Sequence, residues 1–154
     1  MSIESVLKFG AGNVTLNPSP INPDWIIEGN PVARNRLLSE STDGNASTLI
    51  WDCTAGRFMW HYGVDETVYV IEGSVIIKDQ TGVSRRVSAG ETIFFPAGSK
   101  AEWTVEKYIR KVAFCLSPMP RYMRIARSGA KFIKRLVRGG GDRRNSATAM
   151  FQAN

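Results

Sequence analysis

Apolar residues recur along this chain in short strand-like runs that turns separate. From Ser47 to Leu116 the runs are rich in β-branched and aromatic residues, and none of them shows a helical period. They are STLIWDC, RFMWHY, ETVYVIEG, SVIIKD, SRRVS, TIFFP, AEWTV and IRKVAFCL. An earlier short run, DWIIEGNP, ends at the turn Gly29-Asn30-Pro31. Evenly spaced short strands of this composition predict an all-β antiparallel barrel or sandwich.

One of these runs alternates clearly between two faces. Phe58, Trp60 and Tyr62 fall on one side of the run RFMWHY, whereas Met59 and His61 fall on the other side. Because the inner face of a barrel is where large aromatic rings are buried, we expect the three aromatic residues to point inward. His61, the sole histidine of the chain, then lies on the exterior or at a strand interface.

The two ends of the chain differ from this central part. Residues 1–24 are rich in turn residues and proline, and they predict an irregular segment. Residues 25–118 are assigned to the barrel. In residues 119–154, apolar and basic side chains separate onto two faces at a helical period from Arg121 to Arg138, and polar residues follow. This last part predicts a basic amphipathic helix with a polar tail.

The net charge of +6 is divided unequally between these parts. Residues 1–118 hold 11 Lys and Arg against 13 Asp and Glu, a net charge of −2, and residues 119–154 hold 9 against 1, a net charge of +8. A basic amphipathic helix is typical of a segment that docks on an anionic membrane or on an acidic protein surface. Packing on the barrel, or on the second copy of a homodimer, is the alternative. The basic face lacks the interleaved aromatic residues that single-stranded nucleic acid would require.

Length and composition indicate a soluble globular protein. A chain of 154 residues fits one domain, and shares of 43% hydrophobic and 22% charged residues are ordinary. No run has the length of a transmembrane helix, and the first residues lack the apolar core of a signal peptide, so we expect a cytoplasmic protein. Cys53 and Cys115 each lie in an apolar run and are expected to be buried thiols.

Five positions in the centre of the chain carry a family resemblance. Glu66 and Gly73 are followed by Gly90, Pro96 and Gly98 at the spacing of a two-part barrel motif. With the stretches WIIEGNPVARN, WDCTAGRF and FFPAG, the chain resembles the cupin superfamily. More narrowly, it is similar to the small single-domain cupins that resemble the cupin domain of (S)-ureidoglycine aminohydrolase. The resemblance implies a double-stranded β-helix, which is a jelly-roll-like barrel with a ligand cavity, and often a homodimer.

The resemblance also implies where a metal ion would bind, and the chain departs from the family there. The histidine positions of the motif hold Trp60, Tyr62 and Ala101, and Glu66 is the one ligand residue that remains. Indole and methyl groups do not bind metal ions, and a neutral phenol is a poor ligand. We therefore expect no cofactor and no tightly bound metal. The alternative is a divalent metal and a metal-dependent amidohydrolase.

The candidate ligand-binding residues are Trp60, Tyr62, Glu66 and Trp103. Trp103 lies two residues after Ala101 and therefore shares its inward face. Aromatic walls with one carboxylate suit a small organic molecule with an apolar or cationic part, and Glu66 is the candidate acid–base residue if the molecule is converted. The chain shows no other catalytic motif, so the pattern leaves open whether the protein is an enzyme. The alternative is that the rings simply fill the barrel.

Overall fold

The computed structural model describes residue 8, residue 10 and residues 12–118. The helix expected from Arg121 to Arg138 and the polar tail lie outside the described residues. In the part of the chain that the structure describes, no helix has the length and hydropathy needed to cross a membrane. The described residues form strands and one short 3-10 helix, which confirms the all-β prediction.

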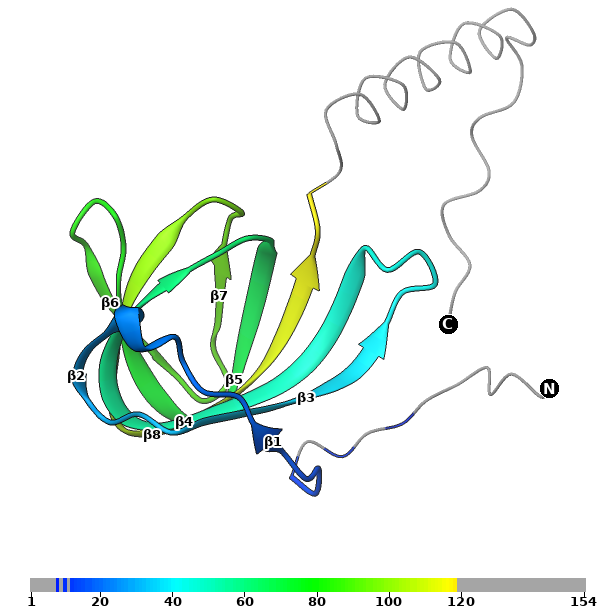
Figure 1. The fold of residues 1–154 in the computed structure, drawn as a ribbon, viewed down its shortest axis with the longest axis horizontal. Helices are drawn as coiled ribbons and strands as arrows, with labels where there is room; N and C mark the ends of the chain where they lie inside the picture. The colour runs from blue at the N-terminus through cyan, green and yellow to red at the C-terminus, as the bar shows by residue number, and fades with distance from the viewer. Residues whose placement is uncertain (1–7, 9, 11, 119–154) are drawn as a thin grey trace, which may run out of the picture. The chain divides into compact units, whose positions relative to one another are not determined.

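Eight antiparallel strands curl into a barrel (Figure 1). Three of them are long, namely β4 (Ala46–His61), β5 (Asp65–Lys78) and β8 (Lys100–Leu116). The short elements are β1 (Asn17–Pro18), the 3-10 helix η1 (Pro23–Trp25), β2 (Ile26–Gly29), β3 (Ala33–Glu40), β6 (Ser84–Ser88) and β7 (Thr92–Phe95).

The three long strands run through both halves of the barrel. One half, the β3 half, has the strand order β1-β3-β4-β8-β5-β7. The other, the β6 half, has the order β2-β4-β8-β5-β6. The change of half coincides with irregular pairing between Thr54 and Gly56 in β4 and between Gly73 and Ile76 in β5. Bulged strands bend in this way when they pass from one packed sheet to the other.

The long strands combine runs that the sequence predicts as separate strands. STLIWDC and RFMWHY are the two ends of β4, because pairing with β8 resumes directly after the bulge at Ala55. The same holds for the two runs of β5 and the two of β8. The sequence did not predict β3, whose residues ARNRLLSE are mostly polar and exposed. Its strand conformation comes from pairing with the first half of β4.

Gly73 occupies the bend of β5. Its φ of +76° lies in the left-handed region, and a Cβ atom built there would overlap the backbone carbonyl of Tyr108 in β8. A glycine at this position therefore allows the two long strands to approach closely where they bend.

The hydrophobic core lies between the two halves. Phe58, Ile77 and Trp103 of the β6 half and Val68 and Ile109 of the β3 half are each no more than 1% exposed. The segment between β1 and η1 crosses one side of the barrel toward β2 (Figure 1) and adds the buried Ile21 to this core.

The outer face of the β3 half carries apolar side chains that the core does not use. Tyr69, Phe94, Phe114 and Leu116 are between 43% and 57% exposed. Thr67 pairs directly with both Phe94 and Phe114, so the two phenyl rings flank it on the same face of the sheet. These four residues are called the outer apolar patch below.

Candidate functional site

The structure brings the four candidate residues into the barrel interior. Tyr62, Glu66 and Trp103 are 4%, 8% and 1% exposed, and Trp60 is partly buried against the core. Trp103 Nε1 donates a hydrogen bond of 2.9 Å to the Tyr62 hydroxyl. His61 is exposed, so the two faces of this part of β4 lie as the alternation predicted.

Aromatic rings from several strands form one cluster around these residues. Trp51 packs edge-on against Trp60 and Trp103, with ring centroids 5.9 and 5.8 Å apart. Trp25 of η1 reaches Trp60 at 5.5 Å. Tyr62 stacks on Phe95 at 4.3 Å with the ring planes 8° apart. All four tryptophans of the chain therefore belong to this cluster.

A buried ion pair lies at the centre of the cluster. Lys111 Nζ donates to Glu66 Oε1 at 2.6 Å, and the two side chains are 5% and 10% exposed. The same ammonium lies 5.0 Å from the ring centroid of Trp51 and 4.8 Å from that of Trp103, within the range of a cation–π contact. Glu66 thus has a partner that the sequence analysis did not identify. The available signal was that Lys111 has the same strand parity as Ile109 in IRKVAFCL.

The pairing of the long strands explains how the ion pair can form. Lys111 lies in a cross-strand row with Trp51 and Val70, whereas Glu66 pairs with Cys115, four residues further along β8. Ala113 lies between them on the same face. Its small side chain leaves room for the lysine side chain to extend toward the carboxylate.

Burial keeps the nearby hydroxyl and thiol groups protonated. Burial, with the negative charge of Glu66 adding to it, raises the pKa of Tyr62 far above its ordinary value. Burial likewise raises the pKa of Cys53 to about 12 and raises the pKa of Cys115, where Glu66 again adds to the effect. Neither cysteine is in a disulfide, so the expectation of buried thiols holds for Cys53, whereas Cys115 is partly exposed.

The rings leave little space between them. A narrow gap, too small to hold a water molecule, is lined by Trp51, Phe58, Trp60, Trp103 and Lys111. Trp51 Nε1 is buried without a hydrogen-bond partner. The space among these rings is therefore filled, and a ligand bound between them would require one of the rings to move.

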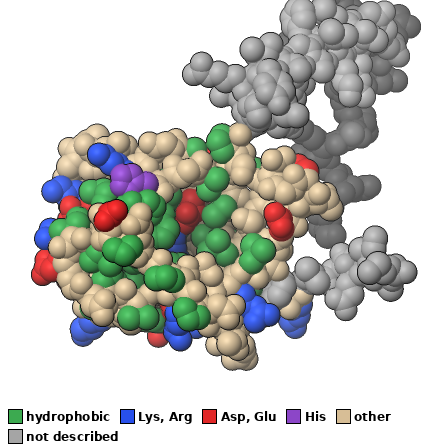
Figure 2. Space-filling model, in the orientation of Figure 1, with side chains coloured by type: hydrophobic (Ala, Val, Ile, Leu, Met, Phe, Trp, Pro, Cys, Tyr) green, Lys and Arg blue, Asp and Glu red, His purple; other side chains and the backbone are tan. Residues whose placement is uncertain are grey.

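Beyond the ion pair, the inner face of the β3 half continues toward a mouth. Leu37, Leu49, Ala113, Val68 and Ile93 pair across the strands in one row, and Leu37 at its end is 55% exposed. Figure 2 shows hydrophobic side chains around a hollow on the face in view. The barrel is therefore lined with apolar side chains where its inner face meets solvent.

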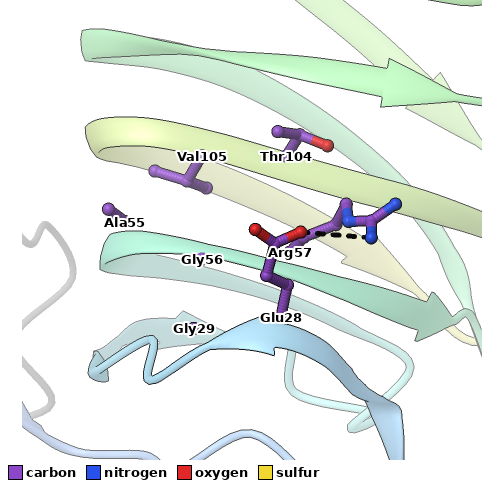
Figure 3. Close-up of a pocket in the computed structure, with 7 residues that line it drawn as sticks. All are labelled: Glu28, Gly29, Ala55, Gly56, Arg57, Thr104 and Val105. Carbon is purple, nitrogen blue, oxygen red and sulfur yellow. Dashed lines mark ion pairs between the residues drawn. The ribbon is translucent and has the colours of Figure 1, made fainter.

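A second hollow lies on the outside of the β6 half. It has a volume of about 280 Å³ and is lined by Glu28, Gly29, Ala55, Gly56, Arg57, Thr104 and Val105 (Figure 3). Arg57 forms ion pairs with Glu28 at 3.1 Å and with Glu102 at 3.4 Å. Because these partners neutralise the guanidinium, the groove presents no unpaired cationic group to an anion.

The residues present do not fit a metal ion. Of the four motif positions, only Glu66 has a ligand atom of ordinary strength, and that carboxylate binds the Lys111 ammonium. The raised pKa of Tyr62 keeps its oxygen a neutral phenol, and Ala101 has no donor atom. Among the described residues, no three His, Cys, Asp or Glu side chains lie close enough together to hold a metal.

Comparison with known proteins places the chain among similar barrels. Residues 40–113 match the family model of the EutQ-like cupin domain. A protein of unknown function of the DUF861 family from Pseudomonas syringae pv. tomato is 30% identical, with a TM-score of 0.62 over 67% of this chain. The chain covers 45% of that protein. No curated protein matches the chain.

Two further structures share the barrel. The Clostridium difficile EutQ protein is 27% identical, with a TM-score of 0.51, over 56% of this chain and 69% of its own. The polyketide cyclase RemF from Streptomyces resistomycificus is 18% identical, with a TM-score of 0.54, over 75% of this chain and 82% of its own. At that identity, RemF supports the fold alone.

Proposed function

We propose that the chain binds or converts a small organic molecule inside the barrel, without a resident metal ion, and the match of residues 40–113 to the EutQ-like cupin domain supports this. The molecule would contact Trp51, Trp60 and Trp103 and the ion pair that they enclose. Barrels of this kind enclose ligands between apolar walls with a few polar groups that orient them.

One observation supports a functional interior over a merely filled one. The Glu66–Lys111 pair is the one buried ion pair among the inward-facing described residues. Two charges removed from water are costly, and well-packed apolar residues would stabilise the barrel at least as well. Buried titratable groups in an otherwise apolar cavity are typical of binding and catalytic sites.

The four tryptophans make binding directly measurable. We expect a ligand from a library of small organic molecules to change the tryptophan emission and to raise the melting temperature. At a ligand concentration of about a hundred times its dissociation constant, the free energy of unfolding should increase by about 2.7 kcal/mol. Trp51→Ala should abolish both effects, since Trp51 lines the gap and stays in contact with the ligand. Val83→Ser, at a position 47% exposed in the β5–β6 hairpin, serves as the matched control and should bind normally.

Two results would contradict this proposal. One is a ligand that stabilises the protein equally in the Trp51→Ala variant. The other is near-stoichiometric manganese, zinc or iron in protein purified without chelator, which would favour the rival, a metal-dependent amidohydrolase resembling (S)-ureidoglycine aminohydrolase. The missing histidines argue against that narrower resemblance.

We also propose that the protein forms a homodimer through the outer apolar patch. Exposed apolar residues that lie side by side commonly mark an interaction surface. Sedimentation equilibrium should show a dimer for the unmodified chain and a monomer for the Phe94→Ser/Phe114→Ser variant. If both proteins are monomers at micromolar concentration, the proposed homodimer is wrong. Docking through Arg121 to Arg138 lies outside the described residues and stays a prediction.

A further inference from the structure

We infer that the barrel interior selects a neutral, planar molecule with a hydrogen-bond acceptor, and that the Lys111 ammonium is the built-in cation which this acceptor faces. The inference rests on the proposed function and narrows its ligand to a chemical class. Three features of the interior support it: the aromatic faces already in use, the balance of charge, and the hydrogen-bond donors left without acceptors.

The aromatic faces that would attract a cationic ligand are already occupied. The Lys111 ammonium lies over the rings of both Trp51 and Trp103, at 5.0 and 4.8 Å. A second cation at these rings would be repelled by the first in a medium of low dielectric constant. The structure thus argues against the cationic ligand that the sequence pattern suggested, because the Lys111 ammonium already occupies the position of that cation.

The interior is also electrically balanced. Glu66 and Lys111 neutralise each other at 2.6 Å. Asp52 is the remaining buried charged residue among those described. It lies on the opposite face of β4, where its carboxylate binds Arg34 and Tyr108. A charged ligand would leave one net charge buried without a partner, which is strongly unfavourable. A neutral ligand keeps the balance.

The polar groups left over in the interior are mainly donors. Trp51 Nε1 is buried without a partner, although Trp51 lines the gap. The Tyr62 hydroxyl accepts from Trp103, and no hydrogen bond donated by it occurs among the described residues. The ammonium has three protons and gives one to Glu66. A ligand oxygen in the gap, such as a ketone carbonyl, would give Trp51 Nε1 and the Lys111 ammonium, whose residues both line the gap, an acceptor that they lack.

Trp60 is the ring that would have to yield to such a ligand. It is only partly buried, whereas Trp51, Phe58 and Trp103 are at most 4% exposed. A flat molecule that displaced Trp60 from the gap would lie against the remaining rings, with its oxygen toward Lys111. Planarity follows because the molecule would take the place of the flat indole ring of Trp60 in the lining of the gap.

Four probes of nearly equal shape test the inference on the full chain. Acetophenone is neutral with an acceptor, α-methylstyrene lacks the acceptor, benzamidinium is a cation and benzoate is an anion. Binding is followed by the four indole N–H signals of protein labelled with nitrogen-15 at tryptophan, and Trp51→Phe identifies the Trp51 signal. We expect acetophenone to bind about tenfold more tightly than α-methylstyrene and to shift the Trp51 signal downfield.

A paired variant tests the role of the ammonium. Lys111→Met with Glu66→Gln removes both charges and keeps the interior neutral. In this variant the affinity for acetophenone should fall at least about threefold toward that for α-methylstyrene, because only Trp51 Nε1 remains as a donor, and the affinity for α-methylstyrene should stay within about twofold. If the variant does not fold, the affinities of the four probes for the unmodified chain still test the inferred ligand class.

The outcomes separate the two proposals. Equal binding of acetophenone and α-methylstyrene, or binding of either charged probe as tight as that of acetophenone, would overturn the inferred ligand class and leave the proposed function standing. If none of the four probes shifts an indole signal, the proposed aromatic site falls, and the inference falls with it.

Discussion

Replacing Gly73 with alanine is expected to destabilise the protein by more than about 4 kcal/mol, enough to prevent recovery of folded protein if its stability is ordinary. The new Cβ would overlap the Tyr108 carbonyl of β8, which is backbone and cannot rotate away. The alanine would also have to keep a φ of +76°, which residues other than glycine rarely adopt. Urea unfolding followed by circular dichroism measures the loss.

Gly82 provides the matched control for this substitution. Its φ is +85°, close to that of Gly73, but a Cβ there would meet no atom within 4 Å. Gly82→Ala should therefore show the backbone strain alone, about 1–2 kcal/mol. Equal losses for the two variants would mean that the close approach of β5 and β8 contributes nothing beyond the φ angle.

The second large effect concerns the buried ion pair. Glu66→Leu leaves the Lys111 ammonium without its carboxylate in the interior, and Lys111→Met leaves the carboxylate without its ammonium. Each single change should cost about 3–5 kcal/mol, because an uncompensated charge stays buried. The double variant should recover most of the loss, since replacing both members of such a pair by apolar residues is often neutral or stabilising.

A double-mutant cycle measures this coupling directly from the free energies of unfolding. We expect the double variant to be at least about 2 kcal/mol more stable than either single variant. Additive losses would show that the two side chains do not depend on each other, and that their 2.6 Å contact is not important in solution.

How far the sequence predicted this structure depends on the strand. At the end of β4 and at Tyr62 directly after it, aromatic residues alternate with Met59 and His61, and the direction of Phe58 and Tyr62 followed from the pattern. In β8 the pattern is misleading. Val112, Phe114 and Leu116 share one face, and pattern alone would bury them in preference to Lys111. The structure exposes Phe114 and Leu116 by about half and buries the lysine.

The candidate site shows the same division. Motif spacing found Glu66, and parity found Tyr62 and Trp103. The partner of Glu66 was not predictable, because it depends on the register of β8 against β5 and on the small Ala113 between the two rows. The degree of filling was not predictable either, since the space left among rings depends on how side chains from several strands pack.

The central place of β8 has a consequence for the order in which the barrel can assemble. β8 lies between β4 and β5 in both halves, yet it is the last of the eight strands to be synthesised. Until it is present, β4 and β5 lack the strand that joins them, and their apolar faces have no shared core. We therefore expect the nascent chain to remain without a stable barrel until β8 is available, so that folding depends on contacts between distant parts of the chain and is correspondingly slow.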